Sequence, residues 1–389
     1  MKLEDIRKIA ILGAGAMGHG IAQVCAMAGY NVVMRDIKKE FVDNGVAKIK
    51  ESLDFLVGKN KLAASEREEI LTKRLTTTID TRAAVGDAQL VIEAVPEILD
   101  LKRSLFKEVS AMCPENAILA TNTSTMSITD IAGSVALPGR MVGLHFFNPV
   151  TKMKLVEIIK GEQTEAGVLS VMTEVVRKIK KEPVTVLKDS PGFIVNRINA
   201  PNQALMNAIL EEGKIRPDEI DTTMRRMGIP MAPFELADFV GLDVYCHTLE
   251  YYAEKLSPDY KPGKVVRKLI ADGKLGMKTG QGIYKWVGDK AQIDMSKPSD
   301  DITAKEFVAI QLNEAVKVFK EGIASSTQEI DQAVVHGMRA FAGPFALCAG
   351  MTAEQMTQPL LKLQDRFKLN ILAPEPELRD GSFKKLSKK

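Results

Sequence analysis

The sequence predicts an α/β domain with a parallel, doubly wound sheet, followed by an all-helical region that contains one helical pattern twice. Three observations predict this fold class. Short β-branched runs alternate with longer amphipathic stretches over the first 190 residues, strand signals nearly vanish after Asp189, and one motif of the helical region recurs near the end of the chain. Alternation of strand and helix is typical of parallel sheets that carry helices on their faces.

The expected strands of the first domain follow one another along the chain. They lie at 8–12, 31–35, 90–93, 117–121, 140–145, 154–159 and 183–187, with helical stretches between most of them. Residues 38–73 interrupt this order because they have the pattern of two helices joined near 58–63, and 75–78 is a candidate for the strand that follows. We therefore place the first domain at 1–190 and a helical insertion at 38–73.

The rest of the chain contains two similar helical segments. They are EEGKIRPDEIDTTMRRMGIPMAPFEL at 211–236 and KEGIASSTQEIDQAVVHGMRAFAGPFAL at 320–347. Both read Glu-Gly, then Glu-Ile-Asp, a glycine and Pro-Phe-x-Leu, with one residue inserted on either side of Glu-Ile-Asp. Shared order and spacing predict a duplicated helical domain rather than a likeness of composition. We place the two copies at 191–296 and 297–389, and expect a loosely ordered tail from about Ala373.

The composition is that of an ordinary globular protein and argues against several classes of function. Apolar residues make up 45% of the chain, charged residues 26%, and the net charge is +3, so nothing predicts a nucleic-acid partner. No stretch is apolar enough for a membrane span, and the start MKLEDIRK has no signal-peptide pattern, so we expect a cytoplasmic protein. The four scattered cysteines predict free thiols, and with only four histidines we expect no metal site.

A glycine-rich turn follows the first expected strand. The run IAILGAGAMG at 9–18 places Gly13, Gly15 and Gly18 in a G-x-G-x-x-G pattern that leads into an amphipathic helix. Gly13 permits the tight turn, Gly15 lets the backbone approach a pyrophosphate, and Gly18 allows close packing of the helix. The N–H groups and the positive dipole end of the helix then face the phosphates. The pattern predicts a Rossmann-type dinucleotide-binding domain.

Asp36 ends the next expected strand, 18 residues after Gly18, and indicates which cofactor binds. A carboxylate at this place accepts hydrogen bonds from ribose hydroxyls and repels a 2′-phosphate, so NAD is favoured over NADP. Arg35 would soften that preference, but alternation along the strand should direct it to the other face. FAD fits the glycine pattern alone, although the sequence offers no identifiable contacts for an isoalloxazine ring. We predict NAD.

A histidine and a glutamate lie near the ends of two apolar strands that a proline-containing turn joins. His145 lies in MVGLHFFNPV at 141–150, and Glu157 lies in KLVEII at 154–159. Oxidation of an alcohol needs a base, and imidazole titrates near neutral pH. A neighbouring carboxylate would fix its tautomer and stabilise the imidazolium. From these two residues alone, a buried histidine that is hydrogen-bonded within the sheet is an equally good interpretation.

Three polar clusters favour the catalytic interpretation. They lie at 93–97, 121–125 and 145–148, where the expected strands end. In an open α/β sheet the ligand crevice lies at the carboxyl ends of the strands. Serine and asparagine side chains there donate hydrogen bonds to an alkoxide or a thioester carbonyl without competing for the proton. Ser124 is the serine of interest, and its alternative role is that of a helix cap.

Eight motifs occur in a family-specific order over about residues 5–287. They are GAGAMGHGIAQ, VIEAVPE, ATNTSTMSIT, GLHFFNPV, MKLVEII, DSPGFIVNRI, PMAPFELADFVGLD and GKLGMKTGQGIYKW. This set resembles the L-3-hydroxyacyl-CoA dehydrogenases, a family that includes bacterial 3-hydroxybutyryl-CoA dehydrogenases. The resemblance implies NAD-dependent oxidation of an (S)-3-hydroxyacyl-CoA thioester to the 3-ketoacyl-CoA, in β-oxidation or reductive C4 metabolism.

The resemblance also implies roles for individual residues. His145 is the general base, Glu157 is its electrostatic partner, Ser124 contacts the substrate oxygens, and Asn196 lies over the substrate. The residues expected to line the cofactor, besides the three glycines and Asp36, are Met17, Glu97, Lys102, Asn148 and Lys278. Ser52 and Lys59 match positions that hold CoA, and a lysine suits its anionic groups. The sequence does not separate Lys59 from Lys61.

The second helical copy departs from many relatives, which end soon after the equivalent of Trp286. Asn196 aligns with Lys305, and the second copy has no counterpart of PGFIVNR, so we expect it to carry no chemistry. In two-copy relatives the copies pack within one chain, so we expect a monomer with an internal pseudo-dimer, or a weak homo-oligomer. The sequence shows no enoyl-CoA hydratase region, which leaves a separate hydratase or thiolase as a candidate partner.

Two rival functions remain open. The first is a dehydrogenase of the same fold that acts on a free hydroxy acid such as L-gulonate, which shares the His–Glu pair but has no use for a CoA-binding lysine. The second is a non-catalytic protein that keeps the fold. The intact set of Ser124, His145, Glu157 and Asn196 argues against it, because a scaffold has no need of all four.

Overall fold

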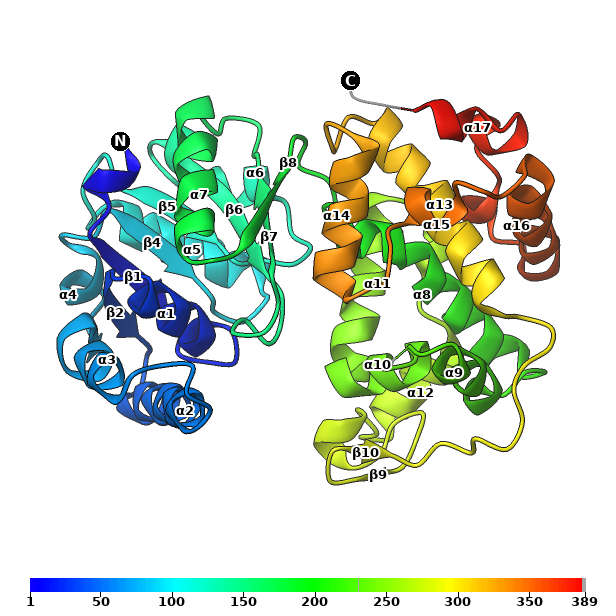
Figure 1. Cartoon of the computed structure of the whole chain (residues 1–389), viewed down its shortest axis with the longest axis horizontal. Coiled ribbons are helices and arrows are strands. Elements are labelled where there is room, and N and C mark those ends of the chain that lie inside the picture. Colours follow the sequence, from blue (N-terminus) through cyan, green and yellow to red (C-terminus); the bar gives the residue numbers. More distant parts are fainter. Residues whose placement is uncertain (230, 387–389) are drawn as a thin grey trace. The chain divides into compact units, whose positions relative to one another are not determined.

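The computed structural model describes residues 1–229 and 231–386 and divides into two compact units (Figure 1). The first unit holds Met1–Ile194, Gly322–Ser325 and Gln332–Phe341. The second unit holds Val195–Glu321, Ser326–Asp331 and the described residues 342–386. Pro230, which begins the PMAPFELADFVGLD motif, and residues 387–389 of the tail lie outside the described residues.

The first unit contains an eight-stranded sheet in the order β3-β2-β1-β4-β5-β6-β7-β8. The strands are β1 (Lys8–Leu12), β2 (Asn31–Arg35), β3 (Leu75–Thr78), β4 (Leu90–Glu93), β5 (Ile118–Thr121), β6 (Met141–Phe146), β7 (Leu155–Ile159) and β8 (Glu182–Val186). All neighbours pair in parallel except β6 and β7, which form an antiparallel pair. Every residue of β4 to β7 is buried, as expected for strands covered on both faces. The predicted parallel sheet is confirmed for β1 to β6, and the last two strands, β7 and β8, run in the opposite direction.

Helices cover this sheet (Figure 1). They are α1 (Gly18–Met27), α2 (Lys39–Gly58), α3 (Ala64–Glu69), α4 (Thr81–Val85), α5 (Leu99–Ser110), α6 (Ile128–Ala132) and α7 (Ala166–Lys178). The segment predicted as a helical insertion holds α2, α3 and the π-helical turn Ile70–Arg74. Residues 322–325 join the first unit through a bond from the Leu187 N–H to the Ile323 carbonyl, 2.8 Å long.

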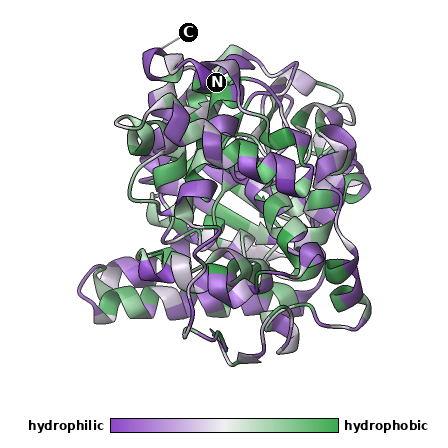
Figure 2. Ribbon diagram, turned by 90° about the vertical axis from the view of Figure 1, so that its right-hand side faces the viewer, coloured by the Kyte–Doolittle hydropathy of each residue, from purple (hydrophilic) through white to green (hydrophobic). Residues whose placement is uncertain are grey.

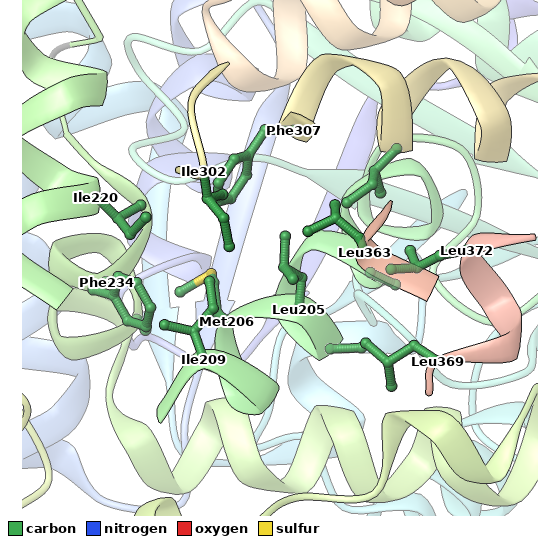
Figure 3. Close-up of a cluster of buried hydrophobic side chains, with 14 of the residues drawn as sticks. Leu205, Met206, Ile209, Ile220, Phe234, Ile302, Phe307, Leu363, Leu369 and Leu372 are labelled. Carbon is green, nitrogen blue, oxygen red and sulfur yellow. The ribbon is translucent and has the colours of Figure 1, made fainter. Parts of the chain in front are cut away.

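The second unit is helical apart from a short hairpin of β9 (Trp286–Val287) and β10 (Lys290–Ala291). Its helices are α8 (Val195–Glu212), α9 (Pro217–Arg226), α10 (Pro233–Val240), α11 (Leu242–Lys255), α12 (Lys264–Ala271), α13 (Ala304–Lys320), α15 (Pro344–Cys348), α16 (Ala353–Phe367) and α17 (Pro376–Arg379), with α14 (Thr327–Met338) divided between the units. One buried cluster joins them: Leu205 and Ile209 of α8 lie with Phe307 of α13 and Leu363 of α16 (Figure 3). Helices α8, α13 and α16 therefore share one core.

The predicted loose tail is wrong over the described residues. The chain after Ala373 forms α17 and a short 3₁₀ helix, Ser382–Lys385. Leu378 and Phe383 are 0% and 2% exposed and belong to the same core as α8 and α13. The many Lys, Pro and Glu residues of this segment suggested solvent exposure, but these few apolar side chains are enough to anchor it.

The helices are amphipathic, with hydrophilic and hydrophobic residues intermixed along them (Figure 2). Among the helices that the structure describes, none is both long enough and apolar enough to cross a membrane.

Two aspartates play the same part in the two similar segments. The carboxylate of Asp221 accepts bonds from the N–H groups of Phe234 and Glu235, at 3.1 and 2.8 Å. The carboxylate of Asp331 accepts bonds from the N–H groups of Phe345 and Ala346, at 2.9 and 2.8 Å. In each case an aspartate on one helix satisfies N–H groups in the first turn of a later helix, α10 or α15, which helix geometry leaves without partners.

We expect Asp221→Ala to destabilise the second unit by about 2–4 kcal/mol, because Asp221 is fully buried and also accepts a bond from the Tyr284 hydroxyl. Asp331→Ala is the matched control and should cost about 1–2 kcal/mol, because it removes only the two bonds at a helix start. Urea unfolding followed by the fluorescence of Trp286, the only tryptophan in the chain, measures both. Equal midpoints for Asp221→Ala and the unaltered protein would contradict this assignment.

Candidate active site

The glycine turn between β1 and α1 combines two tight contacts with one open position. Gly13 has a φ of +107°, and a Cβ there would lie 2.5 Å from the Ala94 carbonyl oxygen. A Cβ on Gly18 would lie 1.8 Å from the Gly13 oxygen, whereas a Cβ on Gly15 would meet no atom within 4 Å. Gly13 and Gly18 are thus required by the chain itself. Gly15 leaves space at the start of α1, where Met17 is the N-cap, as a bound pyrophosphate requires.

Asp36, just after β2, is bonded to this turn. One carboxylate oxygen accepts a bond from the Ala14 N–H at 2.7 Å, and the other accepts one from the Ile37 N–H at 2.7 Å. Arg35 donates its Nε–H to the Ile79 carbonyl instead. The open glycine turn, the helix start and the carboxylate together fit the diphosphate and the adenosine ribose of NAD.

His145 and Glu157 face each other across the only antiparallel pair of the large sheet. They are register partners on β6 and β7, so their side chains lie on the same face. His145 Nδ1 lies 2.7 Å from Glu157 Oε2, and the two residues are 5% and 0% exposed. With Nδ1–H donated to the carboxylate, the lone pair of a neutral ring lies on Nε2, which is the arrangement a general base needs.

The second carboxylate oxygen of Glu157 holds the backbone. Oε1 accepts a bond from the Ile194 N–H at 3.0 Å, at the last residue of the first unit. Sequence reasoning missed this contact, because nothing in the motif DSPGFIVNRI marks a backbone N–H as a partner for a residue on another strand. The two bonds fix the carboxylate from both sides.

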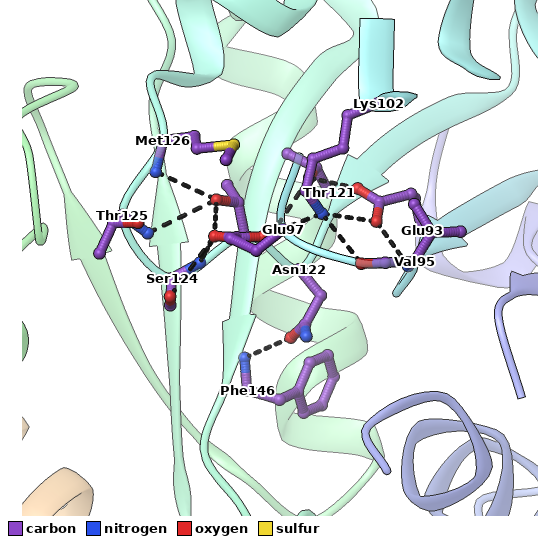
Figure 4. Close-up of polar contacts among 11 residues, drawn as sticks. Glu93, Val95, Glu97, Lys102, Thr121, Asn122, Ser124, Thr125, Met126 and Phe146 are labelled. Carbon is purple, nitrogen blue, oxygen red and sulfur yellow. Dashed lines mark hydrogen bonds and ion pairs between the residues drawn. The ribbon is translucent and has the colours of Figure 1, made fainter. Parts of the chain in front are cut away.

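A network of charges lies at and just after the ends of β4 and β5, with Glu93 and Lys102 buried and the Glu97 side chain 38% exposed (Figure 4). The Lys102 ammonium lies 2.6 Å from Glu93 Oε1 and 3.1 Å from Glu97 Oε2. Glu97 Oε1 also accepts bonds from the Thr123 hydroxyl and from the Ser124 N–H, the latter at 2.8 Å. The network therefore connects two residues predicted to line the cofactor, Glu97 and Lys102, with the predicted substrate contact Ser124.

The pKa values of the two carboxylates in this network are shifted in opposite directions. Burial raises the pKa of Glu93, although Lys102 and the Thr121 hydroxyl act against it. Burial also acts to raise the pKa of Glu97, but the charge of Lys102 and the bonds from Thr123 and Ser124 outweigh it, so this pKa is lowered. Glu97 is therefore held as a carboxylate that orients the Ser124 loop. Lys102 is only 1% exposed and its ammonium contacts both acids, and its contact with the cofactor stays a prediction.

Asn122 is a positioning residue that sequence reasoning missed. Its Oδ1 accepts a bond from the Phe146 N–H at 2.9 Å, which ties the end of β5 to the residue after His145 (Figure 4). The signal was present, since Asn122 lies inside the TNTST cluster beside Ser124. Asn148 lies just after β6 and precedes a cis peptide bond to Pro149.

The two residues expected at CoA lie on and just after α2. The Ser52 hydroxyl accepts a bond from Gln23 Nε2 of α1 at 2.9 Å. Lys59 is the C-cap of α2, and its ammonium lies 5.7 Å from the centre of the Phe55 ring. Lys61 follows in the exposed turn and has no such ring contact among the described residues.

The other two predicted site residues belong to the second unit. Asn196 lies in the first turn of α8. Lys278 lies in the 3₁₀ turn Met277–Thr279, and its ammonium contacts both carboxylate oxygens of Asp243 at 2.6 Å. Among the described residues no group of three or more His, Cys, Asp or Glu side chains could hold a metal ion.

Comparison with protein-family models matches both parts of the chain. Residues 8–190 match the 3-hydroxyacyl-CoA dehydrogenase NAD-binding domain, and residues 192–286 match the 3-hydroxyacyl-CoA dehydrogenase C-terminal domain. The first region contains the glycine turn, Asp36, His145 and Glu157, and the second contains Asn196 and Lys278.

Curated relatives agree with these models. The chain is 40% identical to a probable 3-hydroxybutyryl-CoA dehydrogenase of Deinococcus radiodurans, over 72% of this chain and 100% of that protein. It is 39% identical to a probable 3-hydroxyacyl-CoA dehydrogenase of Caenorhabditis elegans, over 73% and 97%. It is also 35% identical to the fatty acid oxidation complex subunit alpha of Psychrobacter cryohalolentis, over 87% of this chain but only 49% of that subunit.

Solved structures resemble the chain over one or both units. The 3-hydroxybutyryl-CoA dehydrogenase of Escherichia coli has a TM-score of 0.84 and 29% identity, and the match covers 96% of this chain and 98% of that one. The (S)-3-hydroxybutyryl-CoA dehydrogenase of Ralstonia eutropha has a TM-score of 0.68 and 40% identity, over 72% and 99%.

The open position at Gly15 gives a direct test of the cofactor site. We expect Gly15→Val to leave the fold intact, because no atom lies where its Cβ would be, and to weaken NADH binding at least about 10-fold by filling the space at the helix start. Titration by NADH fluorescence and a thermal unfolding scan measure the two effects. Gly18→Ala is the contrasting variant and should destabilise the protein itself, since its Cβ would meet the Gly13 oxygen. Unchanged NADH affinity in Gly15→Val would contradict the placement of the pyrophosphate.

Proposed function

The chain belongs to the 3-hydroxyacyl-CoA dehydrogenase family, and on this premise we propose that it interconverts (S)-3-hydroxyacyl-CoA and 3-ketoacyl-CoA with NAD. The observation that carries the proposal is the buried His145–Glu157 pair on the sheet that also bears the glycine turn. The proposed base and the glycine turn are thus carried by the same large sheet. This suits a reaction in which a proton and a hydride leave the same alcohol.

His145 acts as the general base in the oxidation. Nε2 accepts the proton of the 3-hydroxyl group while Nδ1–H stays bonded to Glu157, whose charge stabilises the imidazolium that forms. When bound, NAD supplies the acceptor for the hydride that leaves carbon 3. On this proposal Ser124 contacts the substrate oxygens and Asn196 lies over the substrate. The Glu97 carboxylate holds Ser124 in place by accepting a bond from its N–H. In the reverse direction the imidazolium returns the proton.

Ser52 and Lys59 contact CoA on this proposal. Both lie at the C-terminal end of α2 or just after it, and Lys59 supplies a cation for the anionic groups of the carrier. Two rival functions predict otherwise: a dehydrogenase of a free hydroxy acid has no use for Lys59, and a non-catalytic protein has no use for the buried pair.

The decisive experiment compares NADH oxidation with acetoacetyl-CoA and with free acetoacetate. We expect turnover with the thioester only, because the free acid lacks the group that α2 binds. Equal rates with both would contradict the thioester proposal and favour a free hydroxy acid, and activity with neither would favour the non-catalytic alternative.

The base is tested by His145→Gln. This variant should bind NADH normally and lose about 10²–10⁴-fold in kcat, which is the usual contribution of a general base. His247→Gln is the control, because the His247 side chain is 85% exposed and lies in the second unit. Activity of His145→Gln within a few-fold of the unaltered protein would mean that the base is another residue.

We further propose that the helical region is a duplicated domain, with copies at 191–296 and 297–389. Besides the two aspartates described above, α8 and α13 are both followed by a glycine with positive φ, Gly213 at +67° and Gly322 at +74°. Lys305 takes the place of Asn196 in the second copy, which on this proposal has no catalytic role.

The two copies then form an internal pseudo-dimer. The Arg197 Nε–H of α8 lies 2.6 Å from Glu314 Oε1 of α13, and both side chains are buried. Because a buried charge is costly without its partner, this pair favours a fixed packing of the two helices. We expect a monomer in solution by size exclusion with light scattering. A tight dimer formed through residues 191–290 would contradict the pseudo-dimer.

Partners and compartment follow from the same proposal. The chain spans about half the length of the fatty acid oxidation complex subunits it resembles. We propose that an enoyl-CoA hydratase or a thiolase acts together with this dehydrogenase. The four cysteines are buried free thiols, as expected in a reducing compartment such as the cytoplasm.

A further inference from the structure

A strained turn lies beside the catalytic pair at the end of the first unit. Gly192 and Phe193 both have positive φ, +79° and +57°, and the Phe193 N–H bonds to the Ser190 carbonyl at 2.9 Å. Glycine adopts this conformation readily, but a bulky aromatic residue rarely does. Such strain persists only where the surroundings hold the residue in place, and it often occurs at functional sites.

The surroundings of Phe193 are the base and its partner. Phe193 is fully buried, and its ring centre lies 5.7 Å from that of His145 with the planes at 58°. The ring of Phe147 lies 4.3 Å from His145 at 45°. The next residue of the turn, Ile194, donates its N–H to Glu157 Oε1. The turn therefore contacts both members of the pair.

We propose that Phe193 is a positioning residue for His145, held in its left-handed conformation so that its ring restrains the imidazole while the next N–H restrains Glu157. This inference rests on the proposed role of His145 as the base. A single bond at Nδ1 leaves the imidazole free to tilt, and tilting moves Nε2 away from the substrate hydroxyl. Tilted contacts with Phe147 and Phe193 restrict that motion, as aromatic pairs at such distances do.

The consequence concerns reaction geometry rather than binding. Displacement of a reacting group by about 1 Å can cost about 100-fold in rate. We therefore expect Phe193→Ala to lower kcat by roughly 10–100-fold and to leave the Kd of NADH within about 3-fold. Phe193→Leu, which restores apolar volume without a ring, should recover part of the loss. Phe106→Ala is the matched control, because Phe106 is also fully buried in the first unit and, among the described residues, makes no ring contact with His145.

A second measurement separates positioning from general stability. The chain has only four histidines, so ¹⁵N-histidine spectra can be assigned by comparison with His145→Gln. The unaltered protein should show one Nδ1–H tautomer for His145. Phe193→Ala should broaden or shift these ring signals, and Phe106→Ala should leave them unchanged even if it lowers the unfolding temperature.

The outcomes separate this inference from the proposed function. An active His145→Gln would overturn the base, and the inference with it. An inactive His145→Gln, combined with a Phe193→Ala whose kcat and His145 signals match those of Phe106→Ala, would overturn the positioning role alone. Loss of NADH binding in Phe193→Ala would likewise overturn it, because the defect would then lie in the cofactor site.

Discussion

The buried carboxylate of Glu157 is the contact on which the catalytic geometry depends. A charged group with no exposed surface is tolerated only if its oxygens are hydrogen-bonded, and this requirement fixes what surrounds it. One oxygen is hydrogen-bonded to the imidazole of His145, and the other accepts a hydrogen bond from the backbone N–H of Ile194. The antiparallel pairing of β6 and β7 makes the two side chains register partners on one face of the sheet. One side chain thus holds both the His145 imidazole, which is the proposed base, and the backbone at Ile194.

The cofactor side depends on a different constraint, the close approach of backbones around the glycine turn. At Gly13 and Gly18 a side chain would collide with backbone atoms of the chain itself, which explains why both are glycine. At Gly15 a Cβ would meet no atom, so only this glycine needs a bound ligand to explain it. The Asp36 carboxylate accepts a hydrogen bond from the Ala14 N–H of the same turn. At the ends of β4 and β5 the contacts are charged instead. The buried Lys102 ammonium pairs with Glu93 and with Glu97, and Glu97 accepts a bond from the Ser124 N–H.

The sequence predicted the parts of the site that local patterns encode. The strands, the glycine turn and the position of Asp36 follow from periodicity and from residue types at strand ends, and the structure places them as expected. The sequence also places His145 and Glu157 near strand ends, but those two residues alone leave a structural histidine equally open, and the structure shows them in contact. Asn122 and Ile194 were missed because their roles are played by an amide oxygen and a backbone N–H toward distant segments. Phe193 was missed because its importance lies in a backbone angle, and no residue pattern predicts a left-handed phenylalanine. The ordered tail was missed because the sequence does not show that Leu378 and Phe383 pack into the core of the second unit.

The two helical segments differ in a way that explains which contacts each keeps. Asp221 and Asp331 both accept hydrogen bonds from the first turn of the next short helix, α10 or α15. Asp238 accepts the N–H groups of Ile283 and Tyr284 and the indole N–H of Trp286, and thereby anchors the loop that carries Lys278. Counting from the Pro-Phe-x-Leu motifs, its counterpart in the second segment is Ala349. The second segment therefore keeps the aspartate that caps the start of a helix and lacks the one that anchors a loop with a predicted cofactor contact, as expected if its contribution is packing rather than chemistry.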